Sequence, residues 1–406
     1  MTGQLTARVK RAWDKLLVRG FEKGINAQTR RSHLPIGEWA DKCREREAEP
    51  AAPEPCPGSQ DPLVSQGFRL LQQCRSEFRD KCLAMEGLRV LVHLPPAQLS
   101  PGGHSLFTNL IQSLEFIGIA SKSLEWGEGA AGALESFRPT VFITSDHPLY
   151  LDRIDFKALK KYKSAHGLLT GLTASLEQYG NPALEKRLAR AREDGFDFYY
   201  SFRDREYLDS RKEYRPFKER GYRILTVEFG ANPLLYHPVP GIARDLDYVF
   251  LASVNHDKRP RYFAYLGKIV AEKYGYLDGP GWGFSRGAGM LPERDKYLYA
   301  RARLGLNLHL QEQIDWPCEL NERTYQLAAC GLPQLIDNPA LLKKRFGPDC
   351  FFSAGSPKEY RELFEHILSH PDQARERALQ AQRQVFASHT TFHRAEQFAR
   401  QLKEML

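Results

Sequence analysis

The chain has 406 residues, more than one ordinary hydrophobic core accommodates, so two domains are expected. It holds no apolar run near the roughly 20 residues that a membrane-spanning helix needs, and its start lacks the apolar stretch and cleavage site of a signal peptide. The formal net charge of +8 permits an anionic partner, whether nucleic acid, anionic lipid or a phosphorylated small molecule, without choosing among them.

The seven cysteines are odd in number, scattered along the chain and without a close Cys-x-x-Cys pair. This usage is typical of reduced thiols rather than of a disulfide framework, and it argues against a zinc site. We therefore expect a cytoplasmic protein.

The first predicted segment is a basic amphipathic helical extension over residues 1–46. Residues 1–31 hold eight lysines and arginines against Asp14 and Glu22, and apolar residues recur there at helical spacing. Two interpretations stay open: a helix on an anionic membrane surface, or a helix that docks on the protein's own body. A linker rich in proline, alanine and glutamate is predicted over 47–62.

Strands and helices then alternate, which predicts parallel sheets of α/β type. A first domain is expected over 63–230. Its predicted strands are 88–94, 139–148, 166–173, 196–201 and 222–230, and its predicted helices are 68–82, 106–117 and 182–194, with 95–105 as a loop.

A second domain is expected over 231–385, after a hinge near 230–246, and a C-terminal helix over 386–406 is expected to cross back to the first domain. The predicted strands are 247–253, 276–277, 303–310, 332–337 and 350–353, and the predicted helices are 260–274, 292–302, 322–330, 339–346, 357–369 and a long helical tail, 371–406. Two doubly wound domains of this kind bind ligands where the carboxyl ends of their strands face a cleft.

The stretch 319-ELNERTYQLAACGLPQLIDN-338 joins a helix start to an apolar strand. Asn321 is a good N-cap residue, and Arg323 in the first turn can offer a bidentate fork to a diphosphate. Gln326, one turn further, can reach a pair of ribose hydroxyls, whereas Glu322 is interpreted as a first-turn helix charge. The plain alternative is a surface helix with ordinary capping.

This stretch resembles the signature of GT-B glycosyltransferases of the CgeB-like, spore-maturation type, within glycosyltransferase group 1. That signature is Asn-x-Arg-x-aromatic-Glu, then small residues, a Cys-Gly pair and a short strand ending in Asp, which Asn321, Arg323, Tyr325, Gln326, Cys330, Gly331 and Asp337 match in order. Further family-like motifs are 229-FGANPLLYHP-238, 247-DYVFLASVNHDKR-259, 279-GPGWG-283 and 388-SHTTFHR-394. The resemblance covers about residues 88–400 and implies a GT-B fold.

The resemblance also implies that the second domain binds the nucleotide of an activated sugar. By position, Ser253, Asn255 and Arg259 would lie near the diphosphate, while Gly281 and Trp282 would lie near the base. Plain turn or core roles stay open for each of them. The chain departs from the family at Gln326, where relatives carry Glu, and it lacks the spaced glutamate pair of many retaining enzymes.

The first domain should hold the acceptor and any general base. His104 and the pair Asp146–His147 follow predicted strands, at the edge where doubly wound folds place their chemistry. The Asp-x-Asp pattern at 245–247 opens a strand at its amino end, so no metal is expected. Positive side chains and helix dipoles should instead neutralise the leaving diphosphate.

The sequence therefore predicts a metal-independent glycosyltransferase, with a nucleotide sugar as co-substrate and a cell-surface glycan or lipid-linked saccharide as acceptor. It would lie in the cytoplasm, peripheral to the cell membrane if residues 1–31 bind lipid. The alternative is a non-catalytic GT-B-like protein that binds a nucleotide sugar or glycan. Nucleic acid is not an expected partner, because the positive residues are spread out and lack interleaved aromatics.

Overall fold

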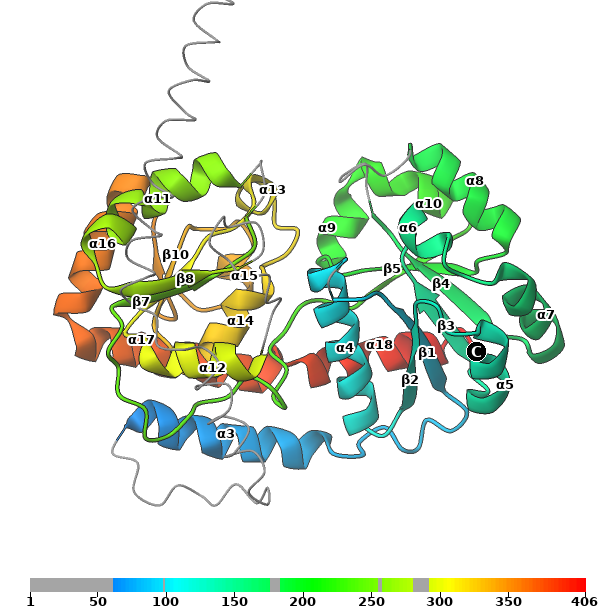
Figure 1. Ribbon diagram of the computed structural model, residues 1–406, viewed down its shortest axis with the longest axis horizontal. Helices are drawn as coiled ribbons and strands as arrows, with labels where there is room; N and C mark the ends of the chain where they lie inside the picture. The colour runs from blue at the N-terminus through cyan, green and yellow to red at the C-terminus, as the bar shows by residue number, and fades with distance from the viewer. Residues whose placement is uncertain (1–60, 98, 176–182, 255–257, 280–291) are drawn as a thin grey trace, which may run out of the picture. The chain divides into compact units, whose positions relative to one another are not determined.

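The computed structural model describes residues 61–97, 99–175, 183–254, 258–279 and 292–406 (Figure 1). The chain divides into two compact units. Of the described residues, the N-terminal unit comprises Leu71–Pro233, Pro317–Tyr325 and Val385–Leu406, and the C-terminal unit comprises Asp61–Leu70, Leu234–Trp316 and Gln326–Gln384. The predicted extension over 1–46 and nearly all of the predicted linker lie outside the described residues.

The N-terminal unit is built on a parallel sheet with the strand order β2-β1-β3-β4-β5-β6. Its strands are β1 (Arg89–Leu94), β2 (Ala120–Glu125), β3 (Val141–Thr144), β4 (Leu169–Thr173), β5 (Phe198–Ser201) and β6 (Arg223–Thr226). From β1 the chain adds β2 on one side and β3 to β6 on the other, so the strand order reverses between β1 and β3. Doubly wound sheets bind ligands at such a switch point.

Helices cover both faces of this sheet, which is why its central strands are continuous apolar runs (Figure 1). Leu91 and Phe142 pack with α5 and α7 on one face, while α18 packs against α4 and β6. The helices here are α4 (Pro101–Phe116), α5 (Ala130–Phe137), α6 (Pro148–Leu151), α7 (Phe156–His166), α8 (Leu184–Asp194), α9 (Arg205–Ser210), the 3-10 helix η1 (Lys212–Tyr214), α10 (Arg215–Glu219) and α18 (Thr391–Lys403).

The C-terminal unit is built on a second parallel sheet, with the order β11-β10-β9-β7-β8. Its strands are β7 (Tyr248–Leu251), β8 (Gly275–Asp278), β9 (Gly305–Asn307), β10 (Gln334–Ile336) and β11 (Phe352–Ser353). The switch point lies between β7 and β9.

The core of this unit packs β7, β9 and β10 against α11 and α16, which also contact each other. Its helices are α11 (Arg259–Glu272), α12 (Pro292–Arg301), α13 (Gln311–Asp315), α15 (Leu342–Arg345) and α16 (Pro357–Ser369). Three further helices are divided between the units: α3 (Pro62–Phe78), α14 (Glu322–Ala329) and α17 (Pro371–Ser388).

The prediction of two parallel α/β sheets is confirmed, and each predicted strand region contains a strand. One strand, β2, and several helices were not predicted: α5, α6, α7, α9, η1, α10 and α13. β2 is an edge strand whose sequence ASKSLE is partly exposed, so it lacks the apolar run that identifies the buried strands.

Several predicted boundaries were wrong, among them the helix predicted over 68–82, which spans Pro62–Phe78. The predicted loop over 95–105 ends early, because α4 begins at Pro101 and contains Gly102 and Gly103. Gly103 serves close packing there, since a Cβ at this position would lie 2.4 Å from the Tyr150 hydroxyl. The predicted continuous tail is two helices, and α18 begins after Thr390, whose side chain caps it.

Among the described residues, no helix is long and apolar enough to cross a membrane. The described cysteines are free and buried: Cys74, Cys82, Cys318, Cys330 and Cys350.

Candidate functional site

The switch point of the C-terminal unit carries a cluster of positive charge. Ser253 follows β7 and is exposed, and its hydroxyl accepts a hydrogen bond from Lys258 Nζ at 3.2 Å. The next residue, Arg259, opens α11, so its guanidinium lies on the same segment as the amino end of the helix. Cations and helix-terminal amides together are a suitable environment for a diphosphate.

The ends of β7 and β8 approach each other closely beside this segment. A Cβ at Gly279 would lie 2.2 Å from the Ala252 carbonyl oxygen, and Gly279 has φ +141°. Both observations require glycine here. Asn255, Gly281 and Trp282, the other predicted donor contacts of this region, lie outside the described residues.

A buried polar network joins the ends of β9 and β10. His309 Nδ1 lies 2.7 Å from Asp337 Oδ1, and Arg261 Nη2 lies 3.0 Å from Asp337 Oδ2. Burial raises the pKa of Asp337, but the charge and hydrogen bonds of His309 and the charge of Arg261 outweigh burial and lower it. The ionised Asp337 thus fixes Arg261 beside the first turn of α11. The sequence reading missed His309, because it lies at the end of an apolar strand with no motif around it.

Helix α14 lies within the stretch 319–338 and carries predicted donor contacts. Asn321 caps it, since its Oδ1 accepts from the Thr324 backbone N–H at 3.0 Å and from the Thr324 hydroxyl at 3.1 Å. Arg323 is half-buried in the first turn. Gln326 is only 4% exposed, one helical turn further along α14.

Glu322 differs from the ordinary first-turn helix charge that was predicted, because its carboxyl is hydrogen-bonded and its pKa is raised by burial. Its Oε1 accepts a hydrogen bond from Asn109 Nδ2 at 3.3 Å, and Asn109 Oδ1 in turn accepts from Asn232 Nδ2 at 3.0 Å. Burial raises the pKa of the Glu322 carboxyl to about 7, and the Asn109 hydrogen bond opposes that rise only in part. Glu322 is therefore a carboxyl that gains and loses its proton near neutral pH.

Replacing Glu322 with glutamine is expected to flatten the pH dependence of stability. Between its ordinary value of 4.5 and its folded value of about 7, the folded Glu322 keeps a proton that the unfolded chain has released. The free energy of unfolding therefore falls as pH rises through this window, and Glu322→Gln removes that fall. Urea midpoints measured on both sides of the window test this, with the exposed Glu362→Gln as control. Equal slopes in wild type and Glu322→Gln would contradict it.

The switch point of the N-terminal unit holds His104, in the first turn of α4. Its Nδ1 lies 2.8 Å from the backbone carbonyl oxygen of Pro95, just after β1. A carbonyl oxygen only accepts, so Nδ1 carries the proton and Nε2 keeps its lone pair. Nε2 has no partner among the described residues. This is the tautomer that a histidine needs to act as a base through Nε2.

His147 has the opposite tautomer. Its Nδ1 accepts from the backbone N–H of Leu149 at 3.2 Å and so caps α6. The neutral ring therefore carries its proton on Nε2, which can donate but not accept. The two histidines lie on touching segments, because the Tyr150 hydroxyl of α6 lies 3.1 Å from Ser100 Oγ at the start of α4.

Asp146 is buried and fully engaged. One carboxylate oxygen pairs with Arg187, and the other accepts hydrogen bonds from Ser175 and, at 3.0 Å, from Thr173. Asp146 is only 2% exposed. Burial raises the pKa of its carboxyl, and the Arg187 charge and the hydrogen bonds oppose that rise. These contacts are those of an internal ion pair that holds the loop after β3, not of an exposed base.

The Asp-x-Asp pair lies at the amino end of β7, as predicted, and both carboxylates are engaged. Asp245 pairs with Arg301, and Asp247 accepts from the Tyr274 backbone N–H at 3.2 Å. No group of three or more His, Cys, Asp or Glu side chains in the described ranges is arranged to hold a metal ion.

Within the N-terminal unit, the structure thus brings His104 and His147 to touching segments at the carboxyl edge of the sheet. Within the C-terminal unit, the structure places Ser253 and Arg259 on the segment between β7 and α11, at the carboxyl edge of the sheet. Two charged residues, Lys258 and Glu322, were not among the predicted site residues, although each adjoins one in the sequence. The signal for Lys258 was its place in a positively charged helix start.

The family comparison covers the second half of the chain. Residues 257–400 match the family model described as glycosyl transferase-like. The matched region contains α11, α14 and the helical tail. No curated protein sequence matches the chain.

Solved structures are similar over most of the chain. Sucrose-phosphate synthase from Thermosynechococcus elongatus superposes with a TM-score of 0.51 at 13% identity, covering 78% of this chain and 99% of that chain. HepE of Anabaena, solved with UDP-glucose, gives 0.50 at 12% identity, covering 78% and 100%. The β-glucosyltransferase of T4 phage gives 0.50 at 13% identity, covering 78% and 98%.

Sequence identities this low show a similarity of fold and nothing more. They confirm the predicted fold class, two Rossmann-like α/β domains of GT-B type, while the narrower resemblance to the CgeB-like type stays a prediction. The chain has the GT-B fold, and its residues 257–400 match a glycosyl transferase-like family model.

Proposed function

We propose that the protein is a glycosyltransferase that moves a sugar from a nucleotide-sugar donor to a hydroxyl group of a glycan or lipid-linked saccharide. The observation that carries the proposal is that the region matching the glycosyl transferase-like model contains both the positively charged start of α11 and the buried side chain of Gln326. The solved structures support it, since HepE of Anabaena was crystallised with UDP-glucose.

In the proposed donor site, Arg259 binds the diphosphate, helped by Lys258 and the amino end of α11, and Ser253 accepts a hydrogen bond from Lys258. The motif around α14 assigns two further donor contacts, Arg323 to the diphosphate and the Gln326 carbonyl to a ribose hydroxyl. These groups stabilise the negative charge that grows on the diphosphate as its bond to the sugar breaks. The proposed site uses no metal ion, because side-chain cations and helix-terminal amides supply the compensating charge.

The proposed base is His104. Its Nε2 takes the proton of the acceptor hydroxyl while that oxygen attacks the anomeric carbon, and the nucleoside diphosphate leaves with the bonding electrons. His147 keeps a donor at Nε2 and is assigned to orient the acceptor. The acceptor class and the membrane attachment through residues 1–31 are parts of the same proposal.

A screen of nucleotide sugars by thermal shift tests the donor site. One donor is expected to raise the melting temperature, because a ligand that binds only the folded state stabilises it. Arg323→Ala is expected to abolish the shift at the same donor concentration, since it removes charge-assisted hydrogen bonds to the diphosphate. Arg400→Ala, which removes an exposed arginine paired with Glu396, is the control and should keep the shift.

If no nucleotide sugar or free nucleotide stabilises the protein, the donor site is wrong. If a donor binds but no glycan or lipid-linked saccharide is glycosylated and the donor is not hydrolysed, the protein binds nucleotide sugars without being an enzyme.

A further inference from the structure

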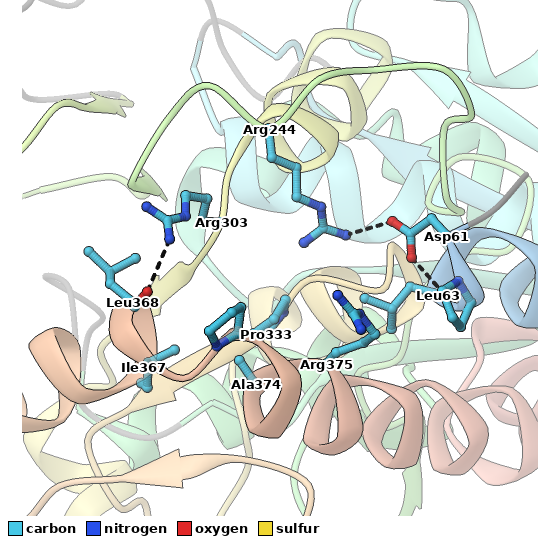
Figure 2. Close-up of a pocket in the computed structure, with 11 residues that line it drawn as sticks. Asp61, Leu63, Arg244, Arg303, Pro333, Ile367, Leu368, Ala374 and Arg375 are labelled. Atoms are coloured by element: carbon cyan, nitrogen blue, oxygen red, sulfur yellow. Dashed lines mark hydrogen bonds and ion pairs between the residues drawn. The ribbon is translucent and has the colours of Figure 1, made fainter.

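The C-terminal unit contains a pocket that the proposed reaction does not use. Its volume is about 520 Å³, and its lining comes from segments that precede β7, β9 and β10, from the end of α16 and from the starts of α3 and α17 (Figure 2). The lining residues are Asp61, Pro62, Leu63, Arg244, Arg303, Pro333, Ile367, Leu368, Pro371, Ala374 and Arg375. Segments that precede parallel strands lie at the amino edge of the sheet, whereas Ser253 and α11 lie at the carboxyl edge. The pocket is therefore separate from the proposed donor site.

Three arginines from three separate segments line this pocket. Arg303 donates to the backbone carbonyl oxygen of Leu368 at 3.0 Å, and its other terminal nitrogen lies 3.4 Å from Asp247. Arg375 pairs with Asp372 at 3.0 Å. Both side chains are more than 40% exposed, at 42% and 45%, so water reaches the guanidinium groups and an incoming anion can reach them too.

Arg244 is the most enclosed of the three and the least compensated. Its Nη2 lies 3.5 Å from Asp61 Oδ2, at the outer limit of a hydrogen bond, and Figure 2 shows the two side chains pointing toward each other. Burial lowers the pKa of the Arg244 guanidinium, Asp61 raises it, and the positive charge of Arg375 lowers it again. Burial and Arg375 thus oppose the charge of Arg244, which Asp61 supports from the limit of hydrogen-bond distance.

Asp61 is the one carboxylate among the described residues of the lining, and it has a second task. Its Oδ1 accepts a hydrogen bond from the backbone N–H of Leu63 at 2.9 Å, which caps α3. Asp61 is therefore the only carboxylate of the described lining, while Arg303 and Arg375 pair with carboxylates outside it, Asp247 and Asp372. The rest of the wall is apolar, from Leu63, Ile367, Leu368, Ala374 and the prolines.

We propose that this pocket binds a phosphoryl group carried on an apolar body, with Arg244, Arg303 and Arg375 as its ligands. Guanidinium groups bind phosphate oxygens through paired hydrogen bonds. A tetrahedral phosphate can accept such bonds from three directions, which the two oxygens of one carboxylate cannot. The apolar half of the wall covers the rest of the ligand, as in other small-molecule sites. Two sources carry this chemistry, a phospholipid and a soluble phosphorylated metabolite.

Two substitutions of opposite effect test the pocket in the full-length protein. Arg244→Gln removes a ligand and is expected to weaken binding about tenfold, the usual effect of losing one charge-assisted hydrogen bond. Asp61→Asn removes the competing charge but keeps an amide oxygen that can cap α3, and it is expected to tighten binding. Arg361→Gln, which removes an arginine of α16 outside the pocket, should leave binding unchanged.

The probe is hexyl phosphate, measured by isothermal titration calorimetry against inorganic phosphate and hexanol. Hexyl phosphate is expected to bind more tightly than either. Equal affinity in wild type and Arg244→Gln, or weaker binding by Asp61→Asn, would overturn the proposal. Binding at the donor site is insensitive to these substitutions, so it cannot imitate the expected pattern.

Vesicles then identify the source. Flotation with vesicles containing phosphatidic acid, lost in Arg244→Gln and absent with phosphatidylcholine alone, would support the site and assign it to a membrane lipid. Binding of hexyl phosphate with the expected pattern but no flotation would support the site and assign it to a soluble phosphorylated ligand.

Discussion

Replacing His104 with alanine is expected to lower kcat by about 10²- to 10⁴-fold, with little change in donor affinity. The reason is the hydrogen bond from Nδ1 to the Pro95 carbonyl oxygen at 2.8 Å, which leaves Nε2 as the basic nitrogen. Loss of that nitrogen removes the acceptor for the hydroxyl proton but leaves the donor contacts in place. Initial rates at saturating donor, together with the donor-induced thermal shift, separate the two effects.

His147→Ala is the matched control, because this histidine lies on a neighbouring segment but has the opposite tautomer. It is expected to affect the apparent KM of the acceptor more than kcat. A larger loss of kcat in His147→Ala than in His104→Ala would reverse the assignment. Full activity in both variants would remove histidine from the mechanism.

Replacing Asp146 with alanine is expected to lower the free energy of unfolding by about 3–5 kcal/mol, because it leaves the buried Arg187 without its counter-ion. Asp146 is 2% exposed and Arg187 is 5% exposed, so water cannot replace the lost partner. Urea unfolding of the variant and the wild type measures the difference.

The double variant Asp146→Leu, Arg187→Met distinguishes an ion pair from a catalytic base. It removes both charges and fills the space with apolar atoms, so it is expected to recover most of the lost stability. If Asp146 only holds the loop, transfer activity should recover along with stability. Recovered stability without any activity would instead assign Asp146 to the chemistry.

The architecture could be predicted because buried parallel strands are mostly apolar. β1 and β3 are of this kind, and the helices α4 and α6 that follow them begin with proline. β2 could not be found in this way, because an edge strand needs no apolar run. Gly103 was wrongly taken as part of a loop, because the sequence alone does not distinguish a glycine needed for close packing from a glycine in a loop.

The site was predictable only in part, and the limit is a physical one. The N-cap role of Asn321 is local and could be read from a few residues. The environment of Glu322 depends on Asn109, which is 213 positions away in the chain. The tautomers of His104 and His147 depend on which backbone group lies beside each ring. The pocket of three arginines joins segments that carry no shared motif.

Helix α18 belongs to the N-terminal unit although it lies at the far end of the described chain. Phe392, Phe398 and Leu402 are fully buried, and α18 packs against α4 and β6. On the ribosome, the strands of this unit emerge first, yet the helix that covers them is made after the whole C-terminal unit. The unit whose strands are synthesised first is therefore completed last, when α18 covers α4 and β6.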